Sequence, residues 1–92
     1  MNKKDVVLFM LGTGRFTRNE ISVLMRVSNS YIYKLADDFF GKNYLRKKPA
    51  TDYGIFYELT ERGEEYLRSK YGENYEKKFE EVMLNIMKKE GG

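Results

Sequence analysis

The sequence predicts a small α+β domain that is mostly helical, with a three-helix core, a two-stranded β-hairpin and a C-terminal helix. Two helical segments with strong N-terminal caps, residues 18–25 and 29–42, are joined by a short link and predict the core. Two short segments predicted to be strands, 44–48 and 55–59, flank a turn-rich segment and predict the hairpin; apolar residues alternate in the second of them. A chain of 92 residues suffices for one such domain, although its core is marginal.

The first helix is expected over residues 3–11 and ends in the glycine-containing segment 12–14. This helix carries apolar side chains on almost all of its faces, which predicts burial on more than one side. The second helix is expected over residues 18–25, because Thr17 and Glu20 have the spacing of a capping box. The boundaries of these two helices therefore follow from local sequence alone.

The third helix is expected over residues 29–42, with Ser28 as its N-cap and one apolar face toward the core. Asn43 is expected to end it in the left-handed conformation, which asparagine tolerates. In the second strand, alternation predicts that Ile55, Tyr57 and Leu59 face inward. Phe56 and Glu58 are then expected to face outward.

The C-terminal part is predicted to be helical and to mediate dimerisation. Thr60 is expected to cap a fourth helix that runs to about Lys70, and residues 73–89 carry an apolar stripe between Glu and Lys side chains. A lone domain of this size offers little surface to cover the stripe, so we expect it to pair with a second copy; the alternative is that it folds back onto its own domain. The expected interface residues are Tyr75, Phe79, Val82, Met83, Ile86 and Met87.

Composition narrows the classes of function. The chain has no cysteine and no histidine, which excludes disulfides and thiolate metal sites and removes the commonest general base. The glutamates lie mostly on helix faces near lysines, and no buried acidic pair supports a small enzyme that uses carboxylates and tyrosines. We therefore expect no catalysis, no metal and no cofactor. No secretory signal or membrane span is visible, so a cytoplasmic location is expected.

Positive charge is concentrated in the first half of the chain. Residues 1–48 contain ten Lys/Arg and four Asp/Glu, whereas residues 49–92 contain seven and ten. This segregation is typical of a protein that presents one face to a polyanion, although chance segregation of solvated charge gives the same pattern.

Three segments resemble the winged helix-turn-helix superfamily, in the style of the MarR- and PadR-like regulators and the small winged-helix proteins of archaea and their viruses. They are residues 16–21, 27–34 and 57–63, and the last resembles the family's Tyr-x-Leu-Thr-x-x-Gly junction between the wing and the following helix. The resemblance covers about half of the chain.

The resemblance implies a sequence-specific, double-stranded-DNA-binding transcription regulator that acts as a homodimer. Residues 1–70 would form the DNA-binding domain, and residues 71–92 the dimerisation helix. The chain departs from the family pattern at Asn43, where glycine is common, and at Asp37 and Asp38, because the corresponding helix is often more basic.

By this resemblance, the N-terminal part of the third helix would enter the major groove. Asn29 could pair with adenine, and Lys34 with guanine or a phosphate, whereas Asp37 and Asp38 should point away from the groove. The alternative is that the polar residues only cap the helix and the tyrosines only pack. The expected groove residues are Ser28, Asn29, Ser30, Tyr31, Tyr33 and Lys34.

The hairpin, or wing, is expected to contact phosphates or an adjacent minor groove. The alternative is that its lysines only protect an edge strand from aggregation. The expected hairpin contacts are Arg46, Lys47, Lys48, Thr51 and Tyr53, with further backbone contacts from Arg15 and Arg18. The expected partners are double-stranded DNA and a second copy, with no membrane and no small-molecule ligand. The competing hypothesis is a winged helix that serves as a protein–protein interaction module, whose wing would be apolar or acidic.

Overall fold

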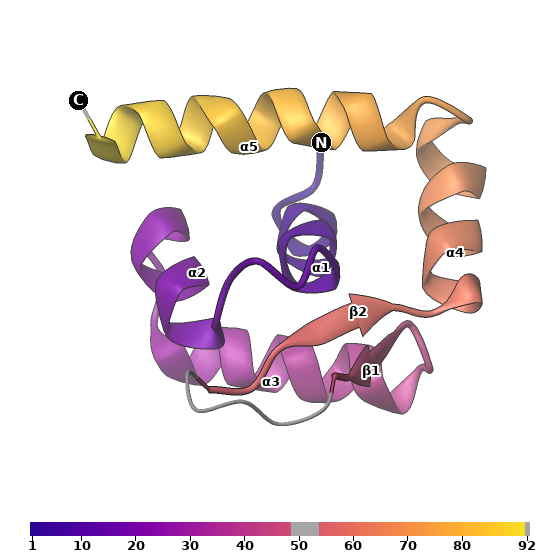
Figure 1. Ribbon diagram of the computed structural model, residues 1–92, viewed down its shortest axis with the longest axis horizontal. Helices are drawn as coiled ribbons and strands as arrows, with labels where there is room; N and C mark the ends of the chain where they lie inside the picture. The colour runs from indigo at the N-terminus through magenta and orange to yellow at the C-terminus, as the bar shows by residue number, and fades with distance from the viewer. Residues whose placement is uncertain (49–53, 92) are drawn as a thin grey trace.

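The computed structural model describes residues 1–48 and 54–91 and has the predicted class, a small α+β domain that is mostly helical (Figure 1). Within these residues it contains five helices and one two-stranded antiparallel sheet. The elements are α1 (Lys3–Gly12), α2 (Arg18–Met25), α3 (Asn29–Gly41), β1 (Leu45–Lys47), β2 (Tyr57–Leu59), α4 (Glu61–Tyr71) and α5 (Tyr75–Gly91).

The predicted helix boundaries are confirmed to within a residue or two at the capped ends. The Thr17 hydroxyl accepts from the Glu20 amide at 3.2 Å, and the Thr17 amide donates to Glu20 Oε1 at 2.9 Å, which completes the capping box. Ser28 accepts from the Tyr31 amide at 3.1 Å and caps α3. Asn43 has a φ of 63°, the predicted left-handed conformation.

Helix α1 lies at the centre of the molecule. Figure 1 looks nearly along its axis, with α5 on one side, α3 and the sheet on the other, and α2 and α4 flanking it. All seven residues from 5 to 11 are buried. The helix is apolar nearly all round because it is covered on several sides, as its sequence predicts.

The hairpin strands are shorter than predicted. They pair with Leu45 opposite Leu59, Arg46 opposite Glu58 and Lys47 opposite Tyr57. The predicted orientations of two residues are wrong: Ile55 is 40% exposed and Phe56 is half-buried. Both precede the start of β2, so the alternation of a paired strand does not yet apply to them.

The junction between β2 and α4 explains the Leu-Thr-x-x-Gly pattern. The buried Thr60 hydroxyl accepts from the Gly63 amide at 3.0 Å and contacts the Asn43 carbonyl oxygen, so it caps α4 and binds it to the end of α3. A Cβ atom at Gly63 would overlap the Tyr44 carbonyl oxygen. Glycine is therefore required here by close backbone approach.

The structure corrects the expectation for the α5 stripe. Tyr75, Phe79 and Met83 are at most 3% exposed and belong to the chain's own core, where the Phe79 ring stacks on Phe9 with centroids 5.1 Å apart. The prediction that these three stay free for a second copy is wrong, because the all-round apolar surface of α1 covers them. Helix α5 therefore contributes to the same core as α1.

The remaining stripe residues are more accessible. Val82 and Ile86 are half-buried against the core, and Met87 is 41% exposed. None of the described helices is long and apolar enough to cross a membrane.

Candidate nucleic-acid interface

Helices α2 and α3 form a closely packed pair. The link between them contains Arg26, whose φ of 57° turns the chain sharply. Helix α3 then directs one face inward, which leaves the opposite face in solvent. The inward residues are Ile32, Leu35, Ala36 and Phe39.

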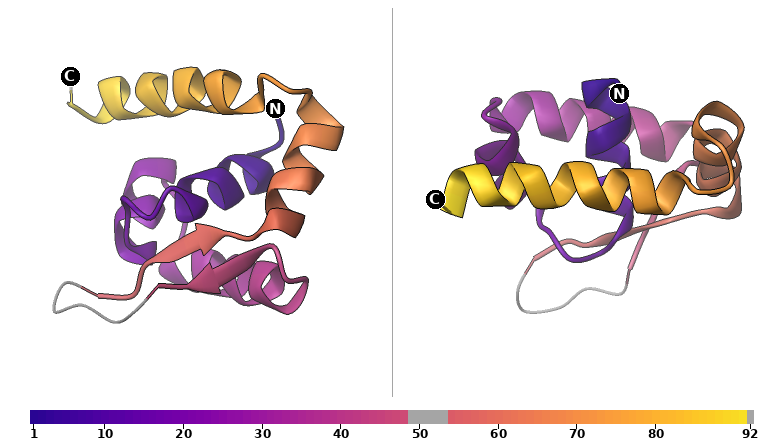
Figure 2. Two further views of the ribbon diagram at one scale, coloured as in Figure 1. Left: turned by 45° about the vertical axis from the view of Figure 1, so that its right-hand side comes forward. Right: turned by 90° about the horizontal axis from the view of Figure 1, so that it is seen from above.

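The solvent face of α3 is not covered by the C-terminal helix. In Figure 1 and in the left-hand view of Figure 2, α5 lies on one side of α1, and α3 and the sheet lie on the other. The two elements expected to contact DNA therefore lie on the side of the molecule that α5 leaves open.

Three predicted groove residues have structural roles. Ser28 caps α3, and Tyr31 is half-buried against the core. Asn29 is exposed, but its Oδ1 contacts the hydroxyl of Ser22, which also donates to the Asn19 carbonyl at 2.7 Å. A bidentate adenine contact uses both the oxygen and the nitrogen of an asparagine side chain, so Asn29 would share its Oδ1 between Ser22 and the base.

The remaining groove candidates lie on the exposed face. Ser30 and Lys34 are exposed one turn apart, and Tyr33 is 37% exposed beside them. Asp37 and Asp38 are also exposed, in the C-terminal half of the same helix. The accessible face of α3 thus changes from neutral and basic at its start to acidic farther along.

Arg18 lies against this face from α2. Its guanidinium carbon is 3.9 Å from the centroid of the Tyr33 ring, and the Tyr33 hydroxyl donates to Asn19 Oδ1 at 3.1 Å. Among the described residues, no carboxylate lies within ion-pair distance of Arg18. Within residues 1–48 and 54–89, the Tyr33 ring therefore holds this arginine without a carboxylate partner.

The cations of the hairpin do not act as one group. Arg46 Nε donates to Glu58 Oε1 of the facing residue at 2.7 Å, and this hydrogen bond lowers the pKa of Glu58 and raises that of Arg46. Lys47 lies on the other face of the strand, with Nζ 5.6 Å from the Phe40 ring of α3. Lys48 is half-buried beside Gly14.

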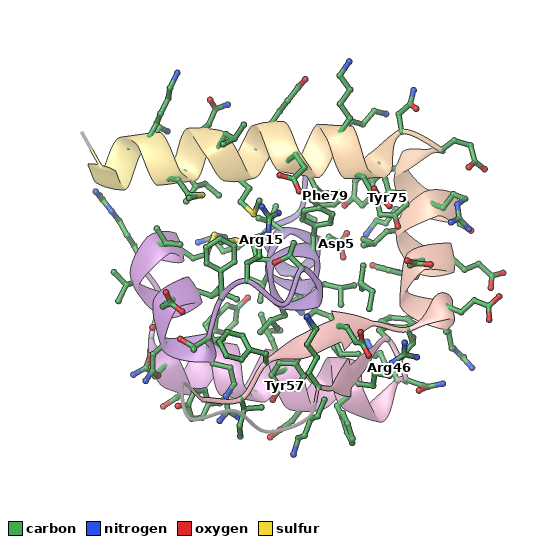
Figure 3. All side chains as sticks on the ribbon, in the orientation of Figure 1. Asp5, Arg15, Arg46, Tyr57, Tyr75 and Phe79 are labelled. Carbon is green, nitrogen blue, oxygen red and sulfur yellow. The ribbon has the colours of Figure 1, made fainter. Side chains whose placement is uncertain are left out.

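Arg15 is directed away from α3. Its Nη2 donates to Glu80 Oε1 of α5 at 2.7 Å, and Figure 3 shows Arg15 toward α5. A surface groove between these elements brings Arg15, Arg46 and Lys48 together with several glutamates. The predicted contacts at Thr51 and Tyr53 lie outside the described residues.

The sequence did not predict a cluster of hydrogen bonds around one buried carboxylate, that of Asp5. Asp5 is 2% exposed and accepts from the Tyr66 hydroxyl at 2.8 Å, from Lys70 Nζ at 2.8 Å and from the Tyr71 hydroxyl. Burial opposes the ionisation of Asp5, but the three hydrogen bonds have the larger combined effect and lower its pKa. The hydrogen bond between Asp5 and Lys70 also raises the pKa of Lys70. The sequence signal for this cluster is a single charged residue, Asp5, at the start of the otherwise apolar segment 5–11. Figure 3 shows Asp5 beside α1, on the side toward α4.

The described residues contain no group of three or more acidic, histidine or cysteine side chains that could hold a metal ion. Neither a protein-family model nor a curated protein matches this chain. Its function therefore has to be inferred from the geometry of its own side chains.

Proposed function

We propose that this chain is a transcription regulator with a winged helix-turn-helix fold, and that it binds double-stranded DNA sequence-specifically through the N-terminal half of α3. The observation that carries the proposal is the exposed start of α3 on the side away from α5, with the Arg18 guanidinium held beside it by the Tyr33 ring. An α-helix is about 10–12 Å across with its side chains, which matches a major groove about 12 Å wide.

The charges around α3 support an approach by its N-terminal end. Arg18 flanks the first half of the helix, and Lys34 is exposed on it, so both could neutralise phosphates. Lys47 lies near Phe40 at the other end and could contact a flanking phosphate. Asp37 and Asp38 would repel phosphates, which favours insertion of the first two turns only.

Duplex binding can be measured by fluorescence anisotropy with labelled random-sequence DNA over a series of salt concentrations. We expect binding that weakens steeply with salt, and Arg18→Ala or Lys34→Ala should each reduce the log–log salt slope by about 0.9. Lys77→Ala removes the same charge from an exposed position on α5 and should leave the slope unchanged. Selection of bound fragments from random duplex DNA would then identify the operator.

Two results would contradict the proposal. The first is that no duplex binds even at about 50 mM salt, where phosphate contacts are strong. A protein–protein interaction module would then be the better hypothesis. The second is an equal loss of affinity from Lys77→Ala and Lys34→Ala, because binding would then depend on net charge and not on α3.

The homodimer remains part of the proposal, but with a different interface. Since Tyr75, Phe79 and Met83 are buried in the chain's own core, a second copy would have to pack on the outer side of α5. Leu84, at 57% exposure, and Met87, at 41%, are the large apolar side chains available there. A two-fold dimer would present two copies of α3 to successive half-sites of a pseudo-palindromic operator.

Sedimentation equilibrium tests this interface separately from DNA binding. We expect the wild-type chain to dimerise and Leu84→Glu to produce a folded monomer. Glu81→Gln, on the same exposed part of α5, serves as the matched control and should remain dimeric. A wild-type chain that sediments as a monomer at every concentration would remove the homodimer and leave the DNA-binding proposal standing.

A further inference from the structure

Tyr33, in the second turn of α3, contacts two residues in the first turn of α2, Arg18 and Asn19. The Tyr33 ring lies against the Arg18 guanidinium at 3.9 Å, and its hydroxyl donates to Asn19 Oδ1 at 3.1 Å. Because Arg18 and Asn19 are adjacent, one tyrosine holds the same helical turn at two points.

Stacking restrains a guanidinium without using its hydrogen-bond donors. A guanidinium on an aromatic face is held through its plane, while its N–H groups point outward around the edge. Arg18 differs in this respect from Arg15 and Arg46, whose donors are engaged by Glu80 and Glu58. No described residue engages the Arg18 donors in a hydrogen bond or ion pair, so they are available to an acceptor such as a phosphate, whose oxygens an arginine can bind in pairs.

We propose that Tyr33 is a positioning residue, which holds Arg18 as a phosphate ligand at the edge of the DNA groove and does not itself read a base. This inference rests on the proposed function. The Tyr33 hydroxyl donates its one hydrogen to Asn19, so it has none left for a base acceptor, and one face of its ring is covered by Arg18. Sequence information would then come from other exposed residues of α3, such as Ser30.

The stack itself can be tested without DNA. In the NMR spectrum of the full chain, the side-chain δ protons of Arg18 should be shifted upfield by the Tyr33 ring. Tyr33→Leu should abolish that shift, whereas Tyr33→Phe, which keeps the ring and loses only the hydroxyl, should retain it. Thermal unfolding of each variant verifies that the chain remains folded. An Arg18 shift that is the same in Tyr33→Leu would overturn the proposal.

The positioning role is tested by anisotropy with random duplex DNA. Arg18→Gln and Tyr33→Leu should each lower the salt slope by about 0.9, and the double variant should lower it no further, because both changes remove one phosphate contact. Tyr33→Phe should keep most of the wild-type slope. Lys34→Gln is the matched control, and its effect should add to that of Tyr33→Leu because it removes an independent contact.

The two proposals fail in different ways. If wild type binds DNA and the effects of Arg18→Gln and Tyr33→Leu add fully, Tyr33 makes its own contact and the positioning role is wrong. If selected sites change their sequence preference in Tyr33→Phe, the hydroxyl reads a base, with the same consequence. If the stack is present by NMR but no duplex binds, the proposed DNA-binding function fails, and the stack serves only to join α2 to α3.

Discussion

Asp5 shows how one polar residue can be fitted into an otherwise apolar helix. A buried carboxylate is costly unless its charge is compensated and its oxygens accept hydrogen bonds. Tyr66, Lys70 and Tyr71 meet both needs, and all three lie in or at the end of α4, 61 to 66 residues away in the sequence. The cluster therefore fixes the start of α1 against α4.

Asp5→Asn should lower the free energy of unfolding at pH 7 by about 1–3 kcal/mol, because hydrogen bonds to a charged group are lost. Folding lowers the pKa of Asp5 below its ordinary value of 3.8, so its stabilising contribution is complete above about pH 4 and is lost as the pH falls through the folded-state pKa. Urea denaturation from pH 7 to pH 2.5 should show a flatter acid dependence for the variant.

The matched control for this prediction is Asp38→Asn, an identical change at an exposed position of α3. It should leave both the stability at pH 7 and its acid dependence nearly unchanged. Equal acid dependence in wild type and Asp5→Asn would show that the cluster does not favour the charged carboxylate.

Asp37 should limit the affinity of α3 for DNA. Its exposed carboxylate lies one turn beyond Lys34 and, in the proposed complex, would repel phosphates. Asp37→Asn should therefore raise the affinity for random duplex DNA roughly two- to fivefold at low salt, with a smaller effect at high salt. Glu81→Gln on α5 removes an equivalent charge and should leave affinity unchanged; a matching gain there would assign the effect to net charge.

At the scale of elements, the β2–α4 junction depends on a close approach between two backbones. Thr60 supplies the cap of α4, and Gly63 allows that helix to lie directly against the Tyr44 carbonyl. The motif is therefore explained by packing as well as by capping.

Gly63→Ala should destabilise the protein by about 1–3 kcal/mol, because the added methyl group overlaps backbone that cannot move without disturbing β1. Gly41→Ala, at the end of α3, is the matched control: a Cβ there meets nothing within 4 Å, and the higher helix propensity of alanine should stabilise by about 0.5–1 kcal/mol. Urea denaturation of both variants compares them directly. A neutral Gly63→Ala would mean that α4 can shift away from Tyr44.

The elements that sequence predicts best are those with local determinants. The caps at Thr17, Ser28 and Thr60 involve residues three positions apart, so the pattern alone defines them. The pairing of Arg46 with Glu58 depends on strand register, and that of Arg15 with Glu80 on how α5 packs. The sequence of α3 alone likewise could not show that Ser22 of α2 contacts Asn29. Nor could it show that Arg18 of α2 contacts Tyr33.

At the scale of the whole molecule, the position of α1 decides what the C-terminal helix does. An amphipathic stripe predicts that one face of a helix is buried, but it does not identify the surface that buries it. The chain's own domain and a second copy both offer apolar surface. Here α1 offers apolar residues on several sides, so α5 completes the core of its own chain. The face of α3 remains open as a result.

Phe79→Ala distinguishes these two roles of α5. The Phe79 ring is fully buried, stacks on Phe9 and makes a T-shaped contact with the Tyr71 ring at a centroid distance of 5.0 Å, so its removal leaves a cavity in the core. The free energy of unfolding should fall by about 3–5 kcal/mol, independently of protein concentration. Leu84→Ala, on the exposed side of the same helix, should change monomer stability by less than about 0.5 kcal/mol. Urea denaturation at two protein concentrations measures the free energy of unfolding of both variants. If the Phe79→Ala monomer is as stable as wild type, α5 does not pack on α1 in solution, and its apolar stripe is available to a second copy.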